Sequence, residues 1–586
     1  MSEVAVAEPD REKVAPTSFA ARHGLSSWDL TALVICLLLL VLFAPPLMFG
    51  GWTLRAALLL MAAPIGLALL VARCRRRDLA AGLLAASLVW TVIVALSSGS
   101  MRSAVLGSAG RDLSAWTIVA SSALWAVGRQ LSDRGRIALV EVYVWGASVV
   151  GLVGAVQVLA DVRTGPLALD SGRPSAFLTN PVYFGAVCAS ALIAATVRWS
   201  PRSWRVQTVP VVVLGVGVSL SGSRVALAAA GVALVGVLLV HRSRDRLAAS
   251  VLGLGSIAAG VLLDRAVGAG RNAADRLAEG AGGGRLTAWG YGLEALGDRP
   301  IRGYGFGMFR PAVQHRFSVD FVREHAANEA SSPWFDAHNV VIGVLVAVGL
   351  VGAVLFLAWV SAWLPRVSGP LAWALVPIVL HWMLQPVSVY TLPLAMLMFG
   401  AAAPGDDRID LHLRRGAVGV LTAVGVVLGL TLFTADVLLK LAADDRNSDR
   451  AEVAALLYLR DPIVDDLVAQ IHARDARLAT PRTDELEWRQ RVTEDEPDRP
   501  FWWSLLARRQ IDAGQLDEAA VSIERALELQ PNNVQTSRAD AVLAVRLGDE
   551  DRLTAALEQL CALGQPECEL TADELLNPSD EPPEGS

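Results

Sequence analysis

Apolar residues occupy most of the first 440 positions, in stretches long enough to cross a membrane as helices. A helix needs about 20 mostly apolar residues to span the hydrocarbon core of a bilayer. None of the stretches alternates with period two for long, which favours helices. The pattern therefore predicts an all-α polytopic membrane protein, with stretches at 30–48, 53–72, 79–97, 114–129, 137–160, 177–197, 206–221, 225–240, 247–263, 338–360, 371–385, 388–402 and 416–436.

Arginines gather in every second loop between these stretches. Short basic loops lie at 73–77, 129–136, 198–205 and 241–246. Short loops rich in Arg and Lys stay in the cytoplasm. We therefore expect these loops and the N-terminal arm, residues 1–28, on the cytoplasmic side. The loops at 98–113, 161–176 and 264–337 are then expected outside.

The apolar region 371–402 admits two topologies, because Pro377, Pro386 and Pro393 divide it. Two crossings there give thirteen transmembrane helices and an extracytoplasmic C-terminus, which is the arrangement we favour. One crossing gives twelve helices and a cytoplasmic C-terminus.

The composition changes near residue 440. Residues 441–586 carry 32 acidic and 15 basic side chains, whereas the first 440 carry 25 and 36. The formal charge of −6 thus combines a basic transmembrane domain, expected at 29–437, with an acidic tail at 441–586. No basic run lies in a soluble part, so a nucleic-acid partner is disfavoured.

The tail resembles a helical repeat domain. Small and apolar residues follow the spacing of the 34-residue tetratricopeptide repeat, and Gly548 lies 34 positions after Gly514. The matching positions are Trp503, Leu506, Gly514, Ala519, Ile523, Ala526 and Pro531. We expect an α-helical solenoid, which would offer a surface for a protein partner but does not name one.

Two of the five cysteines lie seven positions apart in the tail, Cys561 and Cys568. A disulfide between them is expected if the tail lies in an oxidising compartment outside the cytoplasm.

The outward segment 264–337 is the longest break in the apolar body, and long loops often carry function. Four short elements in and around it resemble the signature of a family, in matching order, spacing and topological side. They are Gly172-Arg173-Pro174 with Phe177 and Asn180-Pro181; Ser221-Gly222-Ser223-Arg224; Gly284-Arg285 to Trp289 with Pro300 to Phe309; and His338-Asn339 with Gly349-Leu350-Val351-Gly352. Residues 140–400 resemble the O-antigen ligase and polymerase-like membrane glycosyltransferases.

The resemblance implies a cofactor-free, metal-independent, inverting glycosyltransferase of the bacterial cytoplasmic membrane. Members take a glycan from an undecaprenyl diphosphate carrier and pass it to a lipid, glycan or protein acceptor outside that membrane. His338 is the expected general base, and Arg224 and Arg285 are expected to match the developing diphosphate charge. Arg173, Asn180, Arg299 and Asn339 are candidate substrate-binding residues.

Other interpretations stay open at this point. The candidate arginines are drawn from 49 in a chain with two lysines, so no single one is evidence of phosphate binding. His315 and His325 lie ten positions apart, which is weak support for a metal site, and none is assigned. A transporter of polysaccharide or carrier lipid would also have many helices, but we find no internal repeat. Within the family, ligase and repeat-unit polymerase differ only in the acceptor.

Overall fold

A computed structural model of the chain describes residues 24–42, 51–107, 113–163, 169, 172–199, 204–267, 284–326, 336–403, 409, 415–459, 461–475 and 481–576. Most of the N-terminal arm and loop positions 268–283 and 327–335 therefore lie outside the described residues. Within the described ranges the regular structure is helical and no strand occurs. The predicted all-α class is confirmed.

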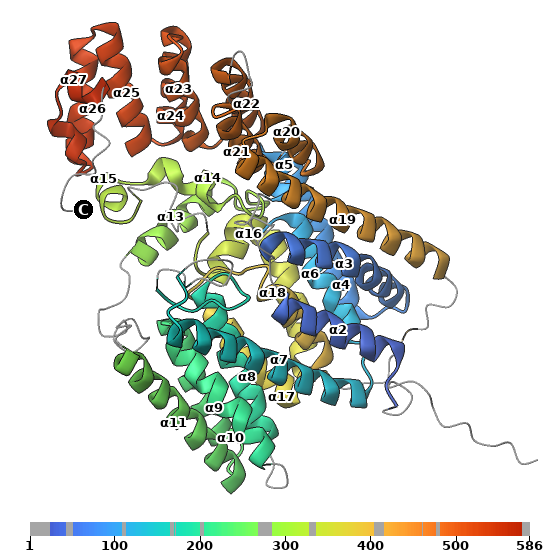
Figure 1. Cartoon of the computed structure of the whole chain (residues 1–586). Coiled ribbons are helices and arrows are strands. Elements are labelled where there is room, and N and C mark those ends of the chain that lie inside the picture. Colours follow the sequence, from blue (N-terminus) through green and yellow to red (C-terminus); the bar gives the residue numbers. More distant parts are fainter. Residues whose placement is uncertain are drawn as a thin grey trace, which may run out of the picture.

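Each of the thirteen apolar stretches coincides with a helix (Figure 1). Seven of these helices are long and apolar enough to cross a membrane, which confirms a polytopic protein. The seven are α3 (Gly51–Arg75), α4 (Leu79–Leu96), α7 (Asp133–Leu159), α8 (Pro181–Arg198), α11 (Arg244–Val267), α16 (Val340–Trp363) and α19 (Arg415–Asp445). The shorter apolar helices are α2 (Ser27–Val41), α6 (Ala115–Gly128), α9 (Trp204–Leu220), α10 (Arg224–Val240), α17 (Gly369–Trp382) and α18 (Leu392–Ala401).

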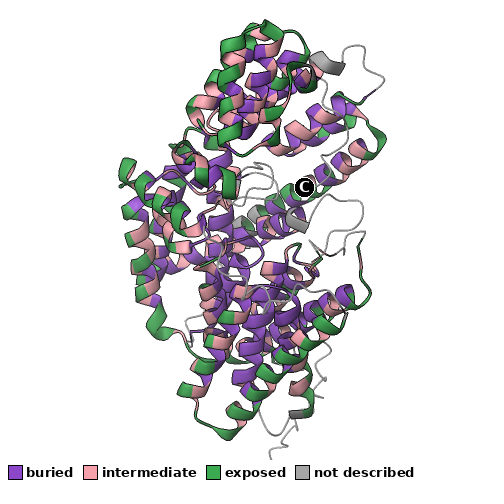
Figure 2. Ribbon diagram, turned by 90° about the vertical axis from the view of Figure 1, so that its left-hand side faces the viewer, coloured by how far each residue is buried: buried purple, intermediate pink, exposed green. Residues whose placement is uncertain are grey.

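These helices pack around a continuous buried core, which Figure 2 shows in purple. Its largest fully buried side chains include Trp125, Trp359 and Trp363, whose rings meet edge to face 5.0–6.1 Å apart. Offset and edge-to-face aromatic contacts of this kind add to the stabilisation from burial. Outward faces of the same helices keep large apolar residues exposed, among them Val232, Val354 and Val427. Such exposure is expected where lipid, rather than water, surrounds the helix.

The basic loops at 73–77 and 129–136 lie together at one end of the helical body. Asp29 at the start of α2 accepts hydrogen bonds from the Ser132 amide and hydroxyl at the start of α7, both at 2.8 Å. Arg129 forms an ion pair with Asp78 and lies 4.3 Å from the ring of Trp363 at the end of α16. The loops that follow α3, α6 and α16 therefore share this end, as alternating crossings require.

The tail consists of paired helices at the opposite end of the body (Figure 1). The helices are α20 (Ser448–Leu457), α21 (Pro462–His472), α22 (Pro481–Asp495), α23 (Pro500–Asp512), α24 (Leu516–Leu529), α25 (Val534–Leu547), α26 (Glu550–Ala562) and the short α27 (Ala572–Leu576). Gly514 and Gly548 turn the chain between paired helices with φ of 79° and 70°, a region that favours glycine. The helix pairs suit a repeat solenoid, and the tetratricopeptide interpretation stays a prediction.

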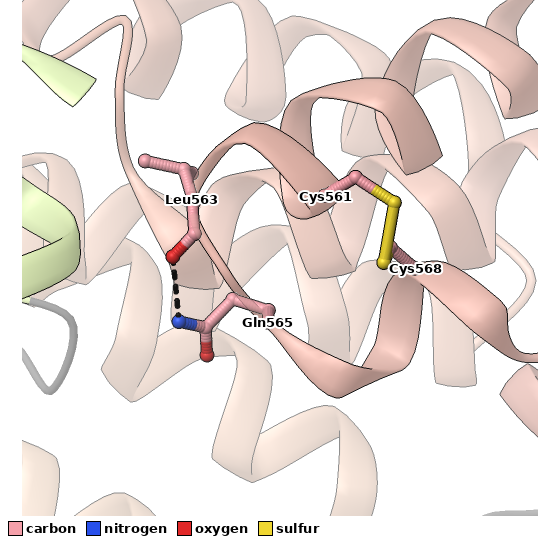
Figure 3. Close-up of a disulfide and its surroundings, with 4 residues drawn as sticks. All are labelled: Cys561, Leu563, Gln565 and Cys568. Carbon is pink, nitrogen blue, oxygen red and sulfur yellow. Dashed lines mark hydrogen bonds between the residues drawn. A yellow bond between two sulfur atoms is a disulfide. The ribbon is translucent and has the colours of Figure 1, made fainter. Parts of the chain in front are cut away.

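A disulfide joins Cys561 at the end of α26 to Cys568, with the two Cα atoms 5.0 Å apart (Figure 3). The turn that it closes holds Leu563, which is fully buried, and Gln565, whose side-chain amide donates to the Leu563 carbonyl at 3.1 Å. This is the pair that the sequence singled out. Cys36, Cys74 and Cys188 are free.

The described part of the outer segment 264–337 includes the further helices α13 (Gly284–Asp298), α14 (Phe309–Val313) and α15 (Val319–Phe321). The tail packs directly on this segment, because Asn532 donates to the Phe317 carbonyl at 2.8 Å. It also packs on α5 (Met101–Leu106), where Arg102 lies 3.4 Å from Asp461. The tail and the outer loops thus share one end of the molecule, although α19 itself runs unbroken through the expected domain boundary at 437–441.

Candidate functional site

The outer half of α16 is broken at Gly349, and the loop fills the break. Gly349 adopts φ 62° and ψ −171° within the helix. The Tyr304 and Gly305 amides donate to the carbonyls of Val346 and Ala347 at 2.9 and 2.8 Å, and the Leu350 amide donates to Pro300 at 2.8 Å. The loop therefore satisfies backbone groups that the kink would otherwise leave unpaired. These hydrogen bonds fix the loop to α16. They also explain why glycines stand at positions 303, 305 and 349, where the two backbones approach each other closely.

We expect Gly303→Ala to destabilise the protein by about 1–3 kcal/mol, because alanine is strained in the left-handed backbone conformation that glycine adopts at this position. Gly303 has φ 71°, and an added Cβ would meet the Val346 oxygen at 2.5 Å and the Gly349 nitrogen at 2.7 Å. Thermal unfolding in detergent measures the effect. Gly290→Ala on α13 is the matched control, because its Cβ would enter open space and alanine favours a helix. Equal unfolding temperatures for the two variants would contradict the docked loop.

His338 lies in the turn just before α16 and is buried, at 8% exposure. Its φ of 51° is unusual for a residue with a side chain. The backbone amide donates to the Asp336 carboxylate at 2.6 Å, and Nδ1 lies 3.0 Å from the Asp336 carbonyl oxygen. Because a carbonyl only accepts, Nδ1 carries the proton of the neutral ring, and Nε2 is the basic nitrogen. Asp336 therefore orients the imidazole as a base would need.

Arg285 is the second residue of α13 and is half-buried. Trp289, one turn later, donates to the Ala337 carbonyl at 2.8 Å, which holds α13 against the His338 turn. Arg224 is the first residue of α10, after a tight turn in which the Ser223 hydroxyl accepts from the Ala226 amide at 3.2 Å. A cation at a helix N-terminus opposes the helix dipole, so the position of Arg224 carries a local cost.

The charges of Arg224 and Arg285 also affect the protonation of the site. Burial, followed by the charge of Arg224, lowers the pKa of Arg285. Burial, together with the charge of Arg285, lowers the pKa of His338 to about 4. Burial raises the pKa of Asp336 to about 6. At neutral pH the site thus contains a neutral imidazole beside two guanidinium groups, at the starts of α10, α13 and α16.

Asn339 caps α16 rather than pointing to open space. Its Oδ1 accepts from the Val341 and Ile342 amides at 2.9 and 3.1 Å, and its Nδ2 donates to the Met383 carbonyl at 3.1 Å. These bonds use most of the amide's capacity. The structure therefore gives Asn339 a part in holding the His338 turn to the end of α17.

Arg173 and Asn180 belong to a second turn, before α8. Arg173 is half-buried, and Asn180 caps α8 by accepting from the Val182 amide at 2.8 Å. The first turn of α8 packs against the Ser221 turn, where a Cβ on Gly185 would meet the Ser221 hydroxyl at 2.5 Å. The Asn180 cap and Arg224 therefore occupy adjacent helix starts.

Arg299 lies elsewhere on the outer segment. Its guanidinium is 4.5 Å from the centre of the Tyr304 ring, and Tyr304 in turn donates to Asp298 at 3.4 Å. The structure thus gives Arg299 a role in the packing of the loop surface.

Arg55 is a buried cation near the site that sequence reasoning missed. It lies in the first turns of α3, fully buried, and donates to the Phe177 carbonyl at 2.8 Å. Its guanidinium lies 4.5 Å from the ring centre of Tyr390, whose hydroxyl accepts from Thr179 at 2.7 Å. Arg55 therefore holds the turn of Arg173 and Asn180. A charge inside an apolar stretch was a usable signal, but the abundance of arginine concealed it.

A cavity of about 540 Å³ lies beside the His338 turn, between α4, α6, α16, α17 and α18. Asp336 and Asn339 line its outer end, and Leu364 and Val367 line the opposite end. The wall between them is almost wholly apolar, with side chains such as Leu88, Ile118, Val344, Phe356, Leu375 and Met396. The cavity can accommodate a flexible hydrocarbon chain along the length of α16.

No group of three or more His, Cys, Asp or Glu side chains is placed to hold a metal ion within the described ranges. The guanidinium groups of Arg224 and Arg285 are cations that can bind an anionic group.

Comparison with curated proteins gives no match for the chain. Residues 209–357, however, match the family model described as O-Antigen ligase. The matched stretch contains Arg224, Arg285, His338 and most of the kinked helix α16, including Gly349. This match supports a relationship between the membrane domain and the O-antigen ligase family. It also supports cell-envelope glycan transfer as the class of activity.

Proposed function

We propose that this protein transfers a glycan from an undecaprenyl diphosphate carrier to an acceptor hydroxyl or amine at the outer face of the cytoplasmic membrane. The observation that carries the proposal is the Trp289–Ala337 hydrogen bond, which holds the helix that begins with Gly284 and Arg285 against the oriented His338, together with the charge effects that link Arg285 to Arg224 and His338. Arg224, Arg285 and His338 lie at three helix N-termini, each of which favours negative charge. The surroundings therefore suit a diphosphate leaving group beside a general base.

The reaction that suits these groups is a single displacement at the anomeric carbon. The acceptor oxygen or nitrogen forms the new bond, and its proton moves to His338 Nε2. The bond between the anomeric carbon and the diphosphate oxygen breaks, and the carrier diphosphate leaves with the electron pair. Arg224 and Arg285 match the charge that develops on its oxygens. Attack opposite to the leaving group inverts the anomeric configuration and requires no metal ion.

The apolar cavity supports a lipid-linked donor. It begins at Asp336 and Asn339, next to the base, and continues toward the far end of α16. A carrier chain in this cavity would bring its diphosphate to the end lined by Asp336 and Asn339, beside the turn that carries His338. A free sugar nucleotide has no part that would use such an apolar wall.

The tail and the outer loops lie at the same end of the body, which favours thirteen crossings and an extracytoplasmic tail. An odd number of crossings from a cytoplasmic N-terminus ends outside, whereas twelve would place the tail with the basic loops. The Cys561–Cys568 disulfide suits an oxidising compartment. We further propose that the tail is a tetratricopeptide-like solenoid, in keeping with its paired helices.

Reconstitution of the purified protein tests the proposed function. In nanodiscs without an ion gradient, and with EDTA present, we expect transfer from a polyprenyl diphosphate glycan to an acceptor. Mass spectrometry would detect the conjugate and the free carrier diphosphate, and NMR would show an inverted linkage. Movement of intact donor across a vesicle membrane without a new glycosidic bond would instead indicate a transporter. Testing lipid, protein and carrier-linked glycan acceptors separates a ligase from a polymerase.

A further inference from the structure

The tail and the outer segment share one apolar core. Phe309, Val313, Phe317, Phe321 and Val322 of the segment are buried in the same cluster as residues of α25, α26 and the turn that follows. The tail residues in this cluster are Val534, Ala541, Ala556, Leu560, Leu563 and Leu575. Other parts of the tail have separate cores, one around Tyr458 and Val468 and one around Ile523 and Leu543.

Polar contacts fix the orientation of this interface. Asn532 donates to the Phe317 carbonyl at 2.8 Å and accepts from Gln559 at 2.9 Å, so its amide is held from both sides. Gln314 donates to the Asp498 carbonyl at 2.6 Å. The disulfide-closed turn contributes Gly564, where an added Cβ would meet the Arg323 side chain at 3.0 Å. The interface therefore has one well-defined register.

The outer segment has little means of folding without this support. The helices α14 and α15 are five and three residues long, far shorter than the about 12–15 residues at which isolated helices become marginally stable. Phe317, which lies between the two helices, and Phe321 of α15 pack between the tail and α13. Tyr291 of α13 lies 5.7 Å from Phe317 and 5.4 Å from Phe321, measured between ring centres, and its hydroxyl accepts from the Ser318 amide at 3.2 Å.

A continuous series of contacts thus leads from the tail to the site. Asn532 of the tail forms a hydrogen bond with the Phe317 carbonyl. The rings of Phe317 and Phe321 in turn pack against the ring of Tyr291. Tyr291 lies on α13, the helix that begins with Gly284 and Arg285. On the same helix, Trp289 bonds the Ala337 carbonyl, next to His338. Figure 1 shows α13, α14 and α15 lying between the tail and the membrane helices.

We propose that the C-terminal tail is a platform that positions α13, and with it Arg285, beside His338. Asn532, Leu563 and Phe317 are then positioning residues. A tail acting as a tethered arm for a partner would leave α13 unchanged when its contact with the loop is weakened. The positioning role rests on the proposed function, whereas the mechanical support of α13 does not.

Hydrogen exchange on the full-length protein tests the mechanical part without any substrate. The docking variant is Asn532→Ala combined with Leu563→Ala, which removes one bond and one fully buried side chain of the shared cluster. We expect amides of residues 286–298 to exchange at least tenfold faster. Leu543→Ala is the matched control, because Leu543 is equally buried but belongs to the tail's own core. It should raise exchange in the tail and leave α13 unchanged.

Transfer kinetics test the positioning part. In the docking variant we expect kcat to fall about tenfold while KM for the lipid-linked donor stays within twofold, because the apolar cavity is not altered. A tail that exchanges faster in the docking variant while α13 stays protected would overturn the platform. Faster exchange in α13 with unchanged kcat would refute the positioning of Arg285. If wild-type protein transfers nothing while the exchange result holds, the proposed function fails and the mechanical support remains.

Discussion

His338→Ala is expected to reduce kcat for glycan transfer by about 10²–10⁴-fold, the usual contribution of a general base. The structure supports the assignment because the Asp336 carbonyl fixes the Nδ1 proton, which leaves Nε2 as the basic nitrogen. KM for the donor should change little, because the apolar cavity and the two arginines stay in place. Initial rates with a saturating donor and a defined acceptor measure the effect.

His315→Ala is the matched control for that experiment. His315 lies on the same outer segment and is exposed, so its removal should leave kcat unchanged. An equal loss in both variants would indicate a general role for loop histidines, including a metal site, rather than base catalysis by His338. Full activity of a folded His338→Ala protein would refute the assigned role.

The pH dependence gives a second measure of the same group. A general base acts when neutral, and His338 has a pKa of about 4. The rate should therefore persist as pH falls below the ordinary histidine pKa of about 6.5 and be lost as pH falls through about 4. Asp336 is the other titrating group at this turn, with a pKa of about 6. Asp336→Asn keeps an oxygen that can accept from the His338 amide and removes that titration.

The membrane helices could be predicted from the sequence because their signal is local. Each apolar stretch specifies its own helix, since a backbone in lipid must satisfy its hydrogen bonds within the segment. The starts of α8, α10 and α16 were not predicted as caps, although Asn180, Ser223 and Asn339 are residue types that cap helices. The candidate site residues Arg224 and His338 were identified because the short elements around them resemble a family signature, since no local pattern singles out one arginine among 49.

The parts that could not be predicted depend on contacts distant in the sequence. The break at Gly349 exists because Pro300 and Tyr304 exchange hydrogen bonds with α16, and a helix-forming apolar stretch gives no sign of them. Arg55 finds its partners at Phe177 and Tyr390, more than a hundred positions away. The tail's apolar faces could be recognised as repeat-like, but repeat spacing does not reveal that one of them covers α14 and α15.

Arg285→Gln is expected to reduce kcat by about 10²–10³-fold, the loss typical when one group that stabilises developing negative charge is removed. The guanidinium acts on charge that appears as the diphosphate leaves, so the effect on KM should be smaller than the effect on kcat. Arg285→Lys keeps the charge but loses the planar fork that can bind two phosphate oxygens, and should recover only part of the rate. Arg302→Gln, at an exposed loop position, is the control and should leave transfer unchanged.

The same variant makes a separate prediction about the pH dependence of the rate. The charge of Arg285 contributes to the lowered pKa of His338, after burial. Without that charge the imidazolium form is less disfavoured and the pKa of His338 rises. The acid limb of the pH profile, where the rate falls as His338 becomes protonated, should therefore move to higher pH in Arg285→Gln. In Arg285→Lys, which keeps a cation at this position, the limb should stay near its wild-type pH. An unchanged limb in Arg285→Gln, despite a reduced kcat, would mean that Arg285 acts on the substrate at a distance from His338. A limb that moves in Arg285→Gln but not in Arg285→Lys, together with the fall in kcat, would place the base and the diphosphate-binding cation in one site, as the single displacement requires.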